Sequence, residues 1–202
     1  MESLNDNKAI CKAGTETLIF DNNNIGYTLL DFWRWSVSDI LSNATRGRFA
    51  EFIVGTAIGL NIQNLRKEWD TYDLETENGI KIEVKSAAFI QSWKQTKYSA
   101  ISFSIKKSIY WDEEIGYSKH PPARHADVYV FCLLNHKNSQ SINPLQLEQW
   151  DFFVVPTYKL DNYPRNQSSI TLRSLEKLCT SGKYRDLKKS IYEAYQEQIQ
   201  KK

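Results

Sequence analysis

The clearest pattern in the chain alternates apolar and charged residues between Trp69 and Lys85, which predicts a β-hairpin with one apolar and one charged face. The apolar set occupies even-numbered positions on both strands: Tyr72, Leu74, Thr76, Ile80, Ile82 and Val84. Residues that face each other across a hairpin share a face, so their numbers must add up to an even value. A three-residue loop from Glu77 to Gly79 meets this condition and gives Gly79 the left-handed backbone that such loops require. A two-residue turn at Asn78 and Gly79 does not meet it.

This register places Asp73 opposite Glu83, with Lys85 two residues further along the same face. Opposed residues have Cβ atoms about 5 Å apart, so two carboxylates and an ammonium are expected on one patch. The ordinary alternative is a solvent-exposed strand face, which is usually charged. Glu75 opposite Lys81 fits that alternative as a simple cross-strand ion pair.

Two helices are predicted before the hairpin. Apolar residues at three- and four-residue intervals predict an amphipathic helix over residues 28–41. Thr45 is the expected cap of a second helix over residues 46–58, which ends near Gly59. The expected buried stripe of this second helix is Phe49, Phe52, Ile53 and Ile58. Glu51 lies beside the stripe, where it either reaches toward the sheet or pairs with Arg46 or Arg48 on the surface.

The remaining chain predicts further strands and two C-terminal helices. Strands are expected over residues 98–105, where Ile101, Phe103 and Ile105 alternate with serines, and over residues 126–134 and 150–156. The middle one is almost entirely apolar and is expected to be a buried central strand. Residues 1–24 are predicted to be a loosely held arm, residues 106–124 a loop with an acidic cluster (Asp112, Glu113, Glu114), and residues 157–170 a loop containing Pro164. Thr171 should cap a short helix, and residues 183–200 should form a basic, exposed one. The order predicts one α/β domain over residues 1–202, a mixed sheet flanked by helices.

Composition narrows the class of protein. Hydrophobic residues make up 41% of the chain, but no run approaches the roughly 20 apolar residues of a membrane span. Three scattered cysteines without metal-ligand spacing favour a reducing compartment, and we expect a cytoplasmic protein. The net charge is only +2, yet residues 81–109 hold six lysines and one acid, which favours a local phosphate-binding patch as much as an ordinary solvated surface.

A helix with an inward glutamate, a strand with an aspartate and then Glu-Val-Lys on the next strand together resemble the PD-(D/E)xK nuclease superfamily. The resemblance covers about half of the chain, from Asn43 to Leu134, and departs from the motif at Tyr72, where proline is usual. It implies a restriction-endonuclease-like fold and a Mg²⁺-dependent nuclease, in which Mn²⁺ can substitute. The metal ligands would be Asp73, Glu83 and the backbone carbonyl of Val84. Lys85 would orient or deprotonate the attacking water, and Glu51 would support the site.

The resemblance also implies a nucleic-acid partner, DNA rather than RNA, in a restriction, defence or repair role. Candidate contacts to it are Gln91, Lys94, Lys97, Arg124 and His125. Whether the protein forms a homodimer or works with a partner subunit stays open at this point. Two other functions also stay open: a nucleic-acid-binding module of the same fold without turnover, and a structural subunit in which Asp73, Glu83 and Lys85 form an ion-pair network.

Overall fold

The computed structural model describes residues 9–61, 63, 65–66, 71–109, 111–112, 116–117, 121–163 and 167–201. At its centre lies a four-stranded sheet in the order β3 (Leu74–Glu75), β4 (Lys81–Ala88), β8 (Val128–Leu134) and β9 (Trp150–Pro156). β4 and β8 run parallel, whereas β3–β4 and β8–β9 are antiparallel. The sheet is therefore mixed, as the sequence predicts.

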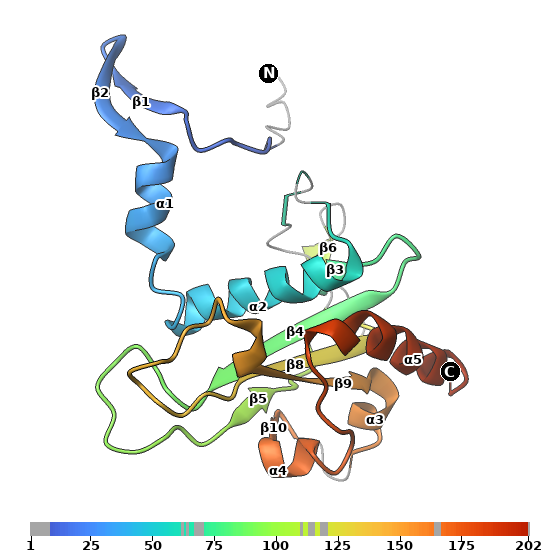
Figure 1. The fold of residues 1–202 in the computed structure, drawn as a ribbon. Coiled ribbons are helices and arrows are strands. Elements are labelled where there is room, and N and C mark those ends of the chain that lie inside the picture. Colours follow the sequence, from blue (N-terminus) through green and yellow to red (C-terminus); the bar gives the residue numbers. More distant parts are fainter. Residues whose placement is uncertain are drawn as a thin grey trace.

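Each face of the sheet is covered by a separate layer (Figure 1). α2 (Asn43–Ile58) and α5 (Leu187–Ile199) pack on the face formed by the even-numbered residues of β4 and β8. On the other face lie α3 (Thr157–Asp161), α4 (Leu172–Leu175) and a two-stranded sheet of β5 (Ser102–Ser104) and β10 (Ser169–Thr171). All seven residues of β8 are buried between the two layers, which confirms it as the central strand. Two short 3₁₀ helices, η1 (Leu147–Gln149) and η2 (Tyr184–Asp186), precede β9 and α5.

The predicted strand around Phe103 is present, but its partner is not the main sheet. Ile101, Phe103 and Ile105 are buried and the serines between them are exposed, so the alternation is confirmed. β5 pairs with β10, however, and forms a second small sheet under the first. Alternation fixes which side chains are buried, but it carries no information on a pairing partner more than 60 residues away.

α2 confirms most of the predicted stripe: Ile53 is buried, and Phe49 and Ile58 pack partly buried against the core. Phe52 is wrong, because it is 47% exposed, and the other buried residues of the helix are Arg46, Ala50, Val54 and Gly55. Small side chains bring the helix backbone close to the sheet, so the contact line follows them rather than Phe52. The helix begins at Asn43 instead of Arg46, and it ends at Gly59 in a left-handed cap, as predicted.

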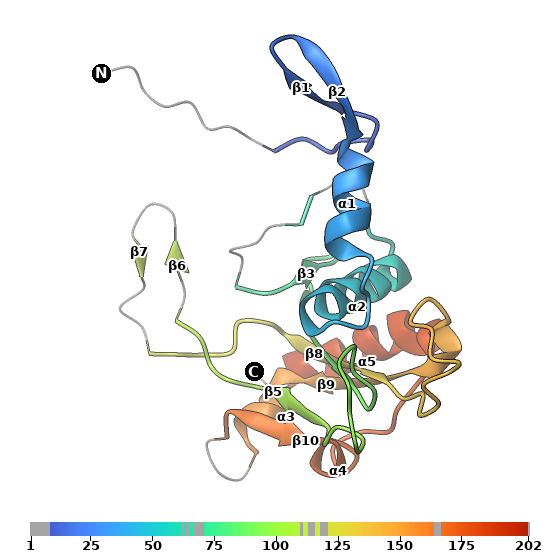
Figure 2. The same ribbon diagram turned by 90° about the vertical axis from the view of Figure 1, so that its left-hand side faces the viewer.

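The predicted loose arm contains regular structure. β1 (Thr17–Phe20) and β2 (Asn23–Thr28) form an antiparallel hairpin that leads directly into α1 (Leu29–Val37). The turn residues Asp21 and Asn22 have φ of 48° and 61°, as in the tight two-residue turns that suit twisted hairpins. Asp and Asn adopt this backbone more readily than other residues with a side chain. The asparagine run is therefore ordered: Asn22 lies in the turn, and Asn23 and Asn24 begin β2. We refer to residues 17–37 as the arm, and it projects from the rest of the molecule, the body (Figures 1 and 2).

Two other segments differ from expectation. α5 is not largely exposed, because Leu187, Ile191 and Ala194 pack on the sheet and leave its basic residues on the outer side. Within residues 106–124, β6 (Trp111–Asp112) and β7 (Gly116–Tyr117) form a small hairpin away from the main sheet (Figure 2). Some residues named above lie outside the described ones: Trp69, Glu113, Glu114 and Pro164. Among the residues that the structure describes, no helix is long and apolar enough to cross a membrane.

Candidate active site

The hairpin that carries the predicted site has the predicted register. Leu74 pairs with Ile82, and Glu75 pairs with Lys81. The Thr76 amide donates to the carbonyl of Ile80 at 3.1 Å, and Gly79, with φ of 76°, closes the loop by donating to the Thr76 carbonyl at 2.9 Å. The connection is therefore the three-residue loop that even-sum pairing requires. Ile80, Ile82 and Val84 are buried, which confirms the apolar face of the return strand.

The alternation breaks before Leu74, where the chain bends over residues 71–73. The Tyr72 hydroxyl donates to Glu75 at 2.6 Å, and the Lys81 ammonium lies 5.1 Å from the centre of the Tyr72 ring. Tyr72 is therefore on the charged face, and its predicted place on the apolar face is wrong. A bend resets the alternation of faces, and no residue type in this stretch signals it.

Asp73 uses this bend to bring its carboxylate to the edge of β4. Its amide donates to the carbonyl of Ile82 at 3.0 Å, and its Oδ2 accepts the amide of Val84 at 2.7 Å. The carboxylate thus takes the place that a main-chain carbonyl of β3 would occupy. In an extended strand the N–H and C=O of one residue point toward the same neighbour, so the Val84 carbonyl also faces this edge.

Glu83 and Lys85 project from the adjacent positions on β4. The Lys85 ammonium donates to the Glu83 carboxylate, and these two side chains are 29% and 18% exposed, respectively. Tyr129 on the neighbouring strand is close enough that burial and the charge of Glu83 both raise the pKa of its hydroxyl. The site therefore opens to solvent at one edge while its floor is buried.

Glu51 reaches the same place from α2. Arg66 donates to both of its carboxylate oxygens, and Arg66 Nη2 lies 3.9 Å from Asp73 Oδ1. The Glu51 side chain is only 13% exposed, and Arg66 lies between it and Asp73, so Glu51 is on the side of α2 that faces the cluster. Sequence reasoning missed Arg66, because the segment between α2 and the hairpin has no periodic pattern. The one available signal is a basic residue shortly before the acidic residues of the hairpin.

The electrostatics of the cluster show most strongly at Asp73. Burial and then the charge of Glu83 raise its pKa to about 6, against the opposing effects of the Val84 amide and Lys85. The charge of Glu51 raises it further. The carboxylates are thus crowded enough that their repulsion is incompletely offset, and an additional cation at this edge would be favourable.

The donor set matches what a small hard cation needs. Among the described residues no three acidic, histidine or cysteine side chains come together closely enough to hold an ion. Mg²⁺, however, is commonly held by one or two carboxylates and retains several waters. Asp73, Glu83 and the carbonyl of Val84 offer oxygen ligands of this kind, so the residues fit Mg²⁺.

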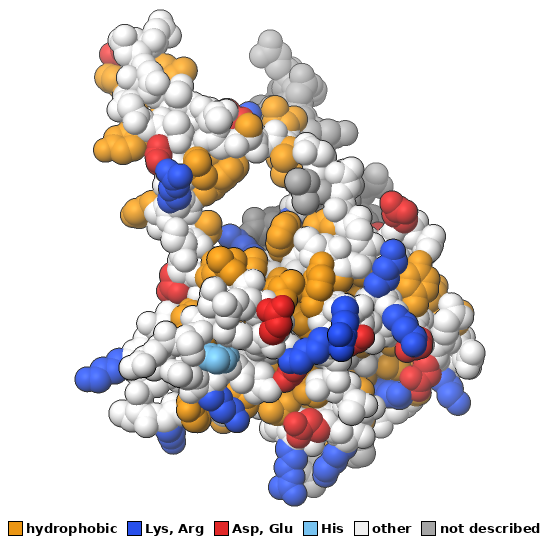
Figure 3. Space-filling model, viewed as in Figure 1, with side chains coloured by type: hydrophobic (Ala, Val, Ile, Leu, Met, Phe, Trp, Pro, Cys, Tyr) orange, Lys and Arg blue, Asp and Glu red, His pale blue; other side chains and the backbone are white. Residues whose placement is uncertain are grey.

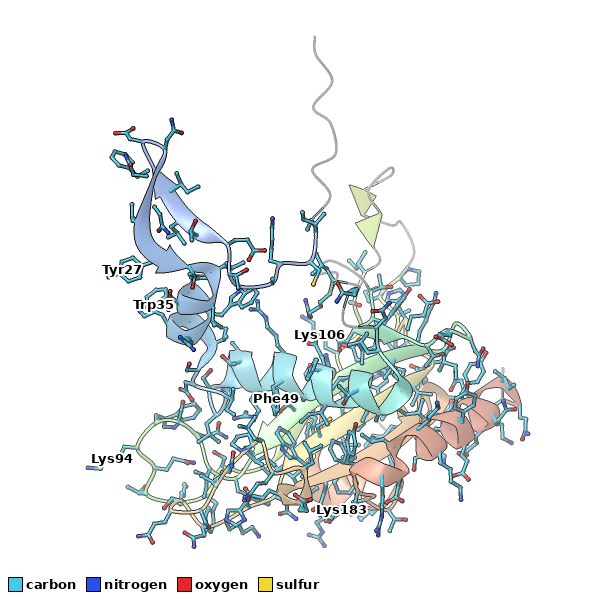
Figure 4. The ribbon with its side chains drawn as sticks, turned by 45° about the horizontal axis from the view of Figure 1, so that its top comes forward. Tyr27, Trp35, Phe49, Lys94, Lys106 and Lys183 are labelled. Atoms are coloured by element: carbon cyan, nitrogen blue, oxygen red, sulfur yellow. The ribbon has the colours of Figure 1, made fainter. Side chains whose placement is uncertain are left out.

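The predicted nucleic-acid contacts divide into two groups. Lys94 and Lys97 are exposed on the loop after β4, and Lys94 extends from it into solvent (Figure 4). Gln91 instead accepts a hydrogen bond from the buried Arg46 and donates to the Ala88 carbonyl and Ser99. Its polar atoms hold the loop in place, so a role in contacting DNA or holding the lysine is not what its position supports.

Arg124 and His125 also have contacts within the fold. The Arg124 side chain is 3% exposed and donates to the Ile105 carbonyl and to Asp161 at 2.6 Å. A buried and paired guanidinium is unavailable to a phosphate from solution, so we assign Arg124 to the fold. His125 Nε2 lies 3.0 Å from the Ser108 carbonyl.

Comparison with known proteins adds one match. A family model described as bacteriophage T4 endonuclease IV matches residues 22–174. The matched range covers the central sheet and includes Glu51, Asp73, Glu83 and Lys85. No curated protein and no solved structure matches the chain.

Proposed function

The chain belongs to the bacteriophage T4 endonuclease IV family, and from this we propose that it is a Mg²⁺-dependent endonuclease that hydrolyses phosphodiester bonds of DNA. The observation that carries the metal-dependent mechanism is the meeting of Asp73, Glu83 and Lys85 at the edge of β4, with Glu51 beside them. The same residue types support the proposed relation to the PD-(D/E)xK superfamily. A role in restriction, defence or repair and a cytoplasmic location stay predictions.

Phosphodiester hydrolysis needs help at two points, because the anionic oxygens repel a nucleophile and the leaving oxygen is a poor one. Asp73, Glu83 and the Val84 carbonyl would hold Mg²⁺, which neutralises charge on the phosphate and lowers the pKa of a bound water. Asp73 is fixed for this task because its Oδ2 accepts the Val84 amide, while its Oδ1 lies 3.9 Å from Arg66 Nη2.

Lys85 is held against Glu83, so its ammonium stays within the site instead of in bulk solvent. From there it can donate a hydrogen bond to a water or to a phosphate oxygen, and so orient the one or stabilise charge on the other. Glu51 is held by Arg66 and would position water at the far side of Asp73. The exposed Lys94 and Lys97 would contact the phosphates of the flanking strand.

The test is cleavage of supercoiled plasmid and linear duplex and single-stranded DNA in Mg²⁺, Mn²⁺ or EDTA. We expect Lys85→Ala to lower the rate at least about 100-fold, the usual contribution of a residue that transfers or directs a proton. Lys81→Ala is the matched control, because Lys81 lies on the same strand and points to the same face but lies over Tyr72. A wild-type protein that binds DNA and cleaves none of these substrates in either metal would instead be a binding module.

The contacts also favour a second candidate, a structural ion-pair network. In the structure Lys85 pairs with Glu83, and Arg66 pairs with Glu51. If these pairs serve only the fold, removing one partner leaves a partly buried charge and lowers the free energy of unfolding by about 3–5 kcal/mol. Thermal melts of Glu83→Ala with and without Mg²⁺ separate the candidates. The network predicts a much lower melting temperature for the variant and no effect of Mg²⁺ on the wild type.

A further inference from the structure

The arm carries large apolar side chains that have no place in the body. None of the nine residues of α1, all of which the structure describes, is buried. The most exposed apolar residues of the arm are Trp35 (84%), Phe20 (69%), Ile19 (67%), Tyr27 (61%) and Phe32 (51%). An amphipathic helix normally buries its apolar side against a neighbour, whereas the apolar side of α1 is open to solvent.

These side chains stand on a well-formed scaffold. Thr28 and Asp31 form a reciprocal capping box at the start of α1, with the Thr28 amide donating to Asp31 at 2.8 Å. The chain before β1 also ties the arm together, since the amides of Leu29 and Leu30 donate to the carbonyls of Glu16 and Gly14, both at 2.8 Å. The exposed rings of Phe20, Tyr27, Phe32 and Trp35, which we call the aromatic surface, are therefore fixed in place before any partner binds. This lowers the entropy lost on association.

The aromatic surface faces away from the body. Tyr27 on β2 and Trp35 on α1 lie one below the other on the outer side of the arm (Figure 4). The Phe32 and Trp35 rings are neighbours, with centroids 6.4 Å apart. In the space-filling view, apolar side chains gather over the arm and a gap separates it from the body (Figure 3). Folding back onto the body does not bury this outer surface.

The exposed area is what a dimer interface needs. Taking 150–250 Å² for a whole aromatic side chain, the four exposed rings leave roughly 500 Å² open to solvent. The largest apolar patch of an ordinary monomer is about 300–600 Å². The rings of the arm alone reach this range, before its aliphatic side chains are counted. Two such patches facing each other would bury on the order of 1,000 Å² from aromatic rings alone, the threshold of a specific interface.

Charge decides against nucleic acid as the occupant. The arm has two acids (Asp21 and Asp31) and one base (Arg34). A phosphate backbone requires net positive charge, which the arm does not offer. A second copy fits better, because Asp31 and Arg34 already pair within α1 at 3.7 Å and leave an apolar aromatic surface that can pack against itself across a two-fold axis.

We propose that the arm is a dimerisation element, whose aromatic surface packs against the same surface of a second copy of the chain. The interface is isologous, with Trp35, Phe32 and Tyr27 at its centre. It places the two active sites in one particle, each in its own body.

Sedimentation velocity of the full chain from 1 to 100 µM tests this proposal. We expect the wild type to be a dimer, and Trp35→Asp to raise the dissociation constant at least about 30-fold, the effect of removing a central aromatic. Trp93→Asp is the matched control, because Trp93 is a similarly exposed tryptophan (54%) on the body, and it should leave the dimer unchanged. Tyr27→Asp repeats the test from β2, and far-UV circular dichroism checks that each variant keeps its helix content.

A wild type that stays monomeric at 100 µM overturns the proposal, and so does a dimer that both arm variants leave intact. Fluorescence anisotropy with labelled DNA covers the remaining occupant. If Trp35→Asp weakens DNA binding while wild type and variant both sediment as monomers, the arm binds substrate and not a second copy.

Discussion

Apolar side chains are buried in the body and exposed in the arm. In β8 every apolar side chain is buried between two layers, whereas α1 has an apolar side of similar character and buries none of its residues, all of them described. Burial in the body stabilises the fold by roughly 25 cal/mol for each Å² of apolar surface removed from water. In the arm the same free energy is still available, and association can release it. The apolar content of an element therefore does not show whether its side chains form a core or an interface. What distinguishes the two is the number of layers that pack around the element.

The largest test of this comparison removes one aromatic ring from each region. Phe131→Ala in β8 should lower the free energy of unfolding by about 3–5 kcal/mol, because the ring is fully buried against Phe103 and leaves a cavity. Trp35→Ala should change it by no more than about 0.5 kcal/mol in the monomer. Urea unfolding at a protein concentration where sedimentation shows a monomer measures both values. A large loss in the Trp35 variant at that concentration would mean that the arm packs on the body.

The comparison also explains which parts of the fold sequence reasoning could reach. The register of the hairpin followed from the parity of Ile80, Ile82 and Val84, because in a strand the face of each residue is a local property. The exposure of Phe52 and the pairing of β5 with β10 depend on neighbours distant in sequence. The β1–β2 hairpin was mistaken for loose chain, because a hairpin turn built from Asp21 and Asn22 resembles a polar loop.

Some residues of the candidate site could likewise be predicted from the sequence, and others could not. Strand register predicted Asp73 near Glu83 and Lys85, although Asp73 reaches β4 through a bend and not along a straight strand. Glu51 was predicted from its place beside a helix stripe. Arg66 could not be found, since its segment has no repeating pattern to fix its direction. The hydrogen bond from the Val84 amide to Asp73 was also out of reach, because it depends on a bend in the chain.

The next largest expected effect on the free energy of unfolding comes from the charge of Asp73 and not from apolar area. The pKa of Asp73 is about 6 in the folded protein, against an ordinary value of 3.8. Between these two values the folded chain keeps a proton that the unfolded chain releases, so the free energy of unfolding falls as pH rises from about 4 to 6. The full difference is about 3 kcal/mol and persists above pH 6. Asp73→Asn should remove it and still accept the Val84 amide. The variant should therefore be the more stable protein at pH 7.

Urea unfolding in EDTA at pH 4, 5, 6 and 7 measures this effect. The wild type should lose stability across the series, and Asp73→Asn should lose about 3 kcal/mol less. Glu77→Gln, which changes an exposed acid in the same hairpin, is the control and should follow the wild type. Equal pH dependence in all three proteins would mean that Asp73 is not crowded by its neighbours.

A smaller effect is expected from metal. At a Mg²⁺ concentration ten times the dissociation constant, binding to the folded state should add about 1.4 kcal/mol to the free energy of unfolding. The gain should be present at pH 8, decline as pH falls through 6 because Asp73 takes up a proton, and be absent in Asp73→Asn. Trp35→Ala should show the full gain, since the arm contributes no proposed ligand. Thermal melts across a Mg²⁺ titration provide the measurement; a gain that survives in Asp73→Asn would place the ion elsewhere.

The smallest expected effect compares two glycines, Gly79 in the hairpin of the active site and Gly26 in the hairpin of the arm. Their φ angles are 76° and 86°, and an added Cβ would meet no atom closer than 3.8 Å at Gly79 and none within 4 Å at Gly26. Alanine should therefore cost about 1 kcal/mol of backbone strain at either position, without a steric clash. At Gly79 the strain should appear in global unfolding, because the hairpin is part of the buried sheet. At Gly26 global unfolding should be unchanged, since the arm can open while the body stays folded. Hydrogen exchange separates the two outcomes: Gly26→Ala should speed exchange within residues 17–37 about fivefold and leave β8 as slow as in the wild type. Faster exchange in β8 as well would show that arm and body unfold together, and the contrast between the two regions would fail.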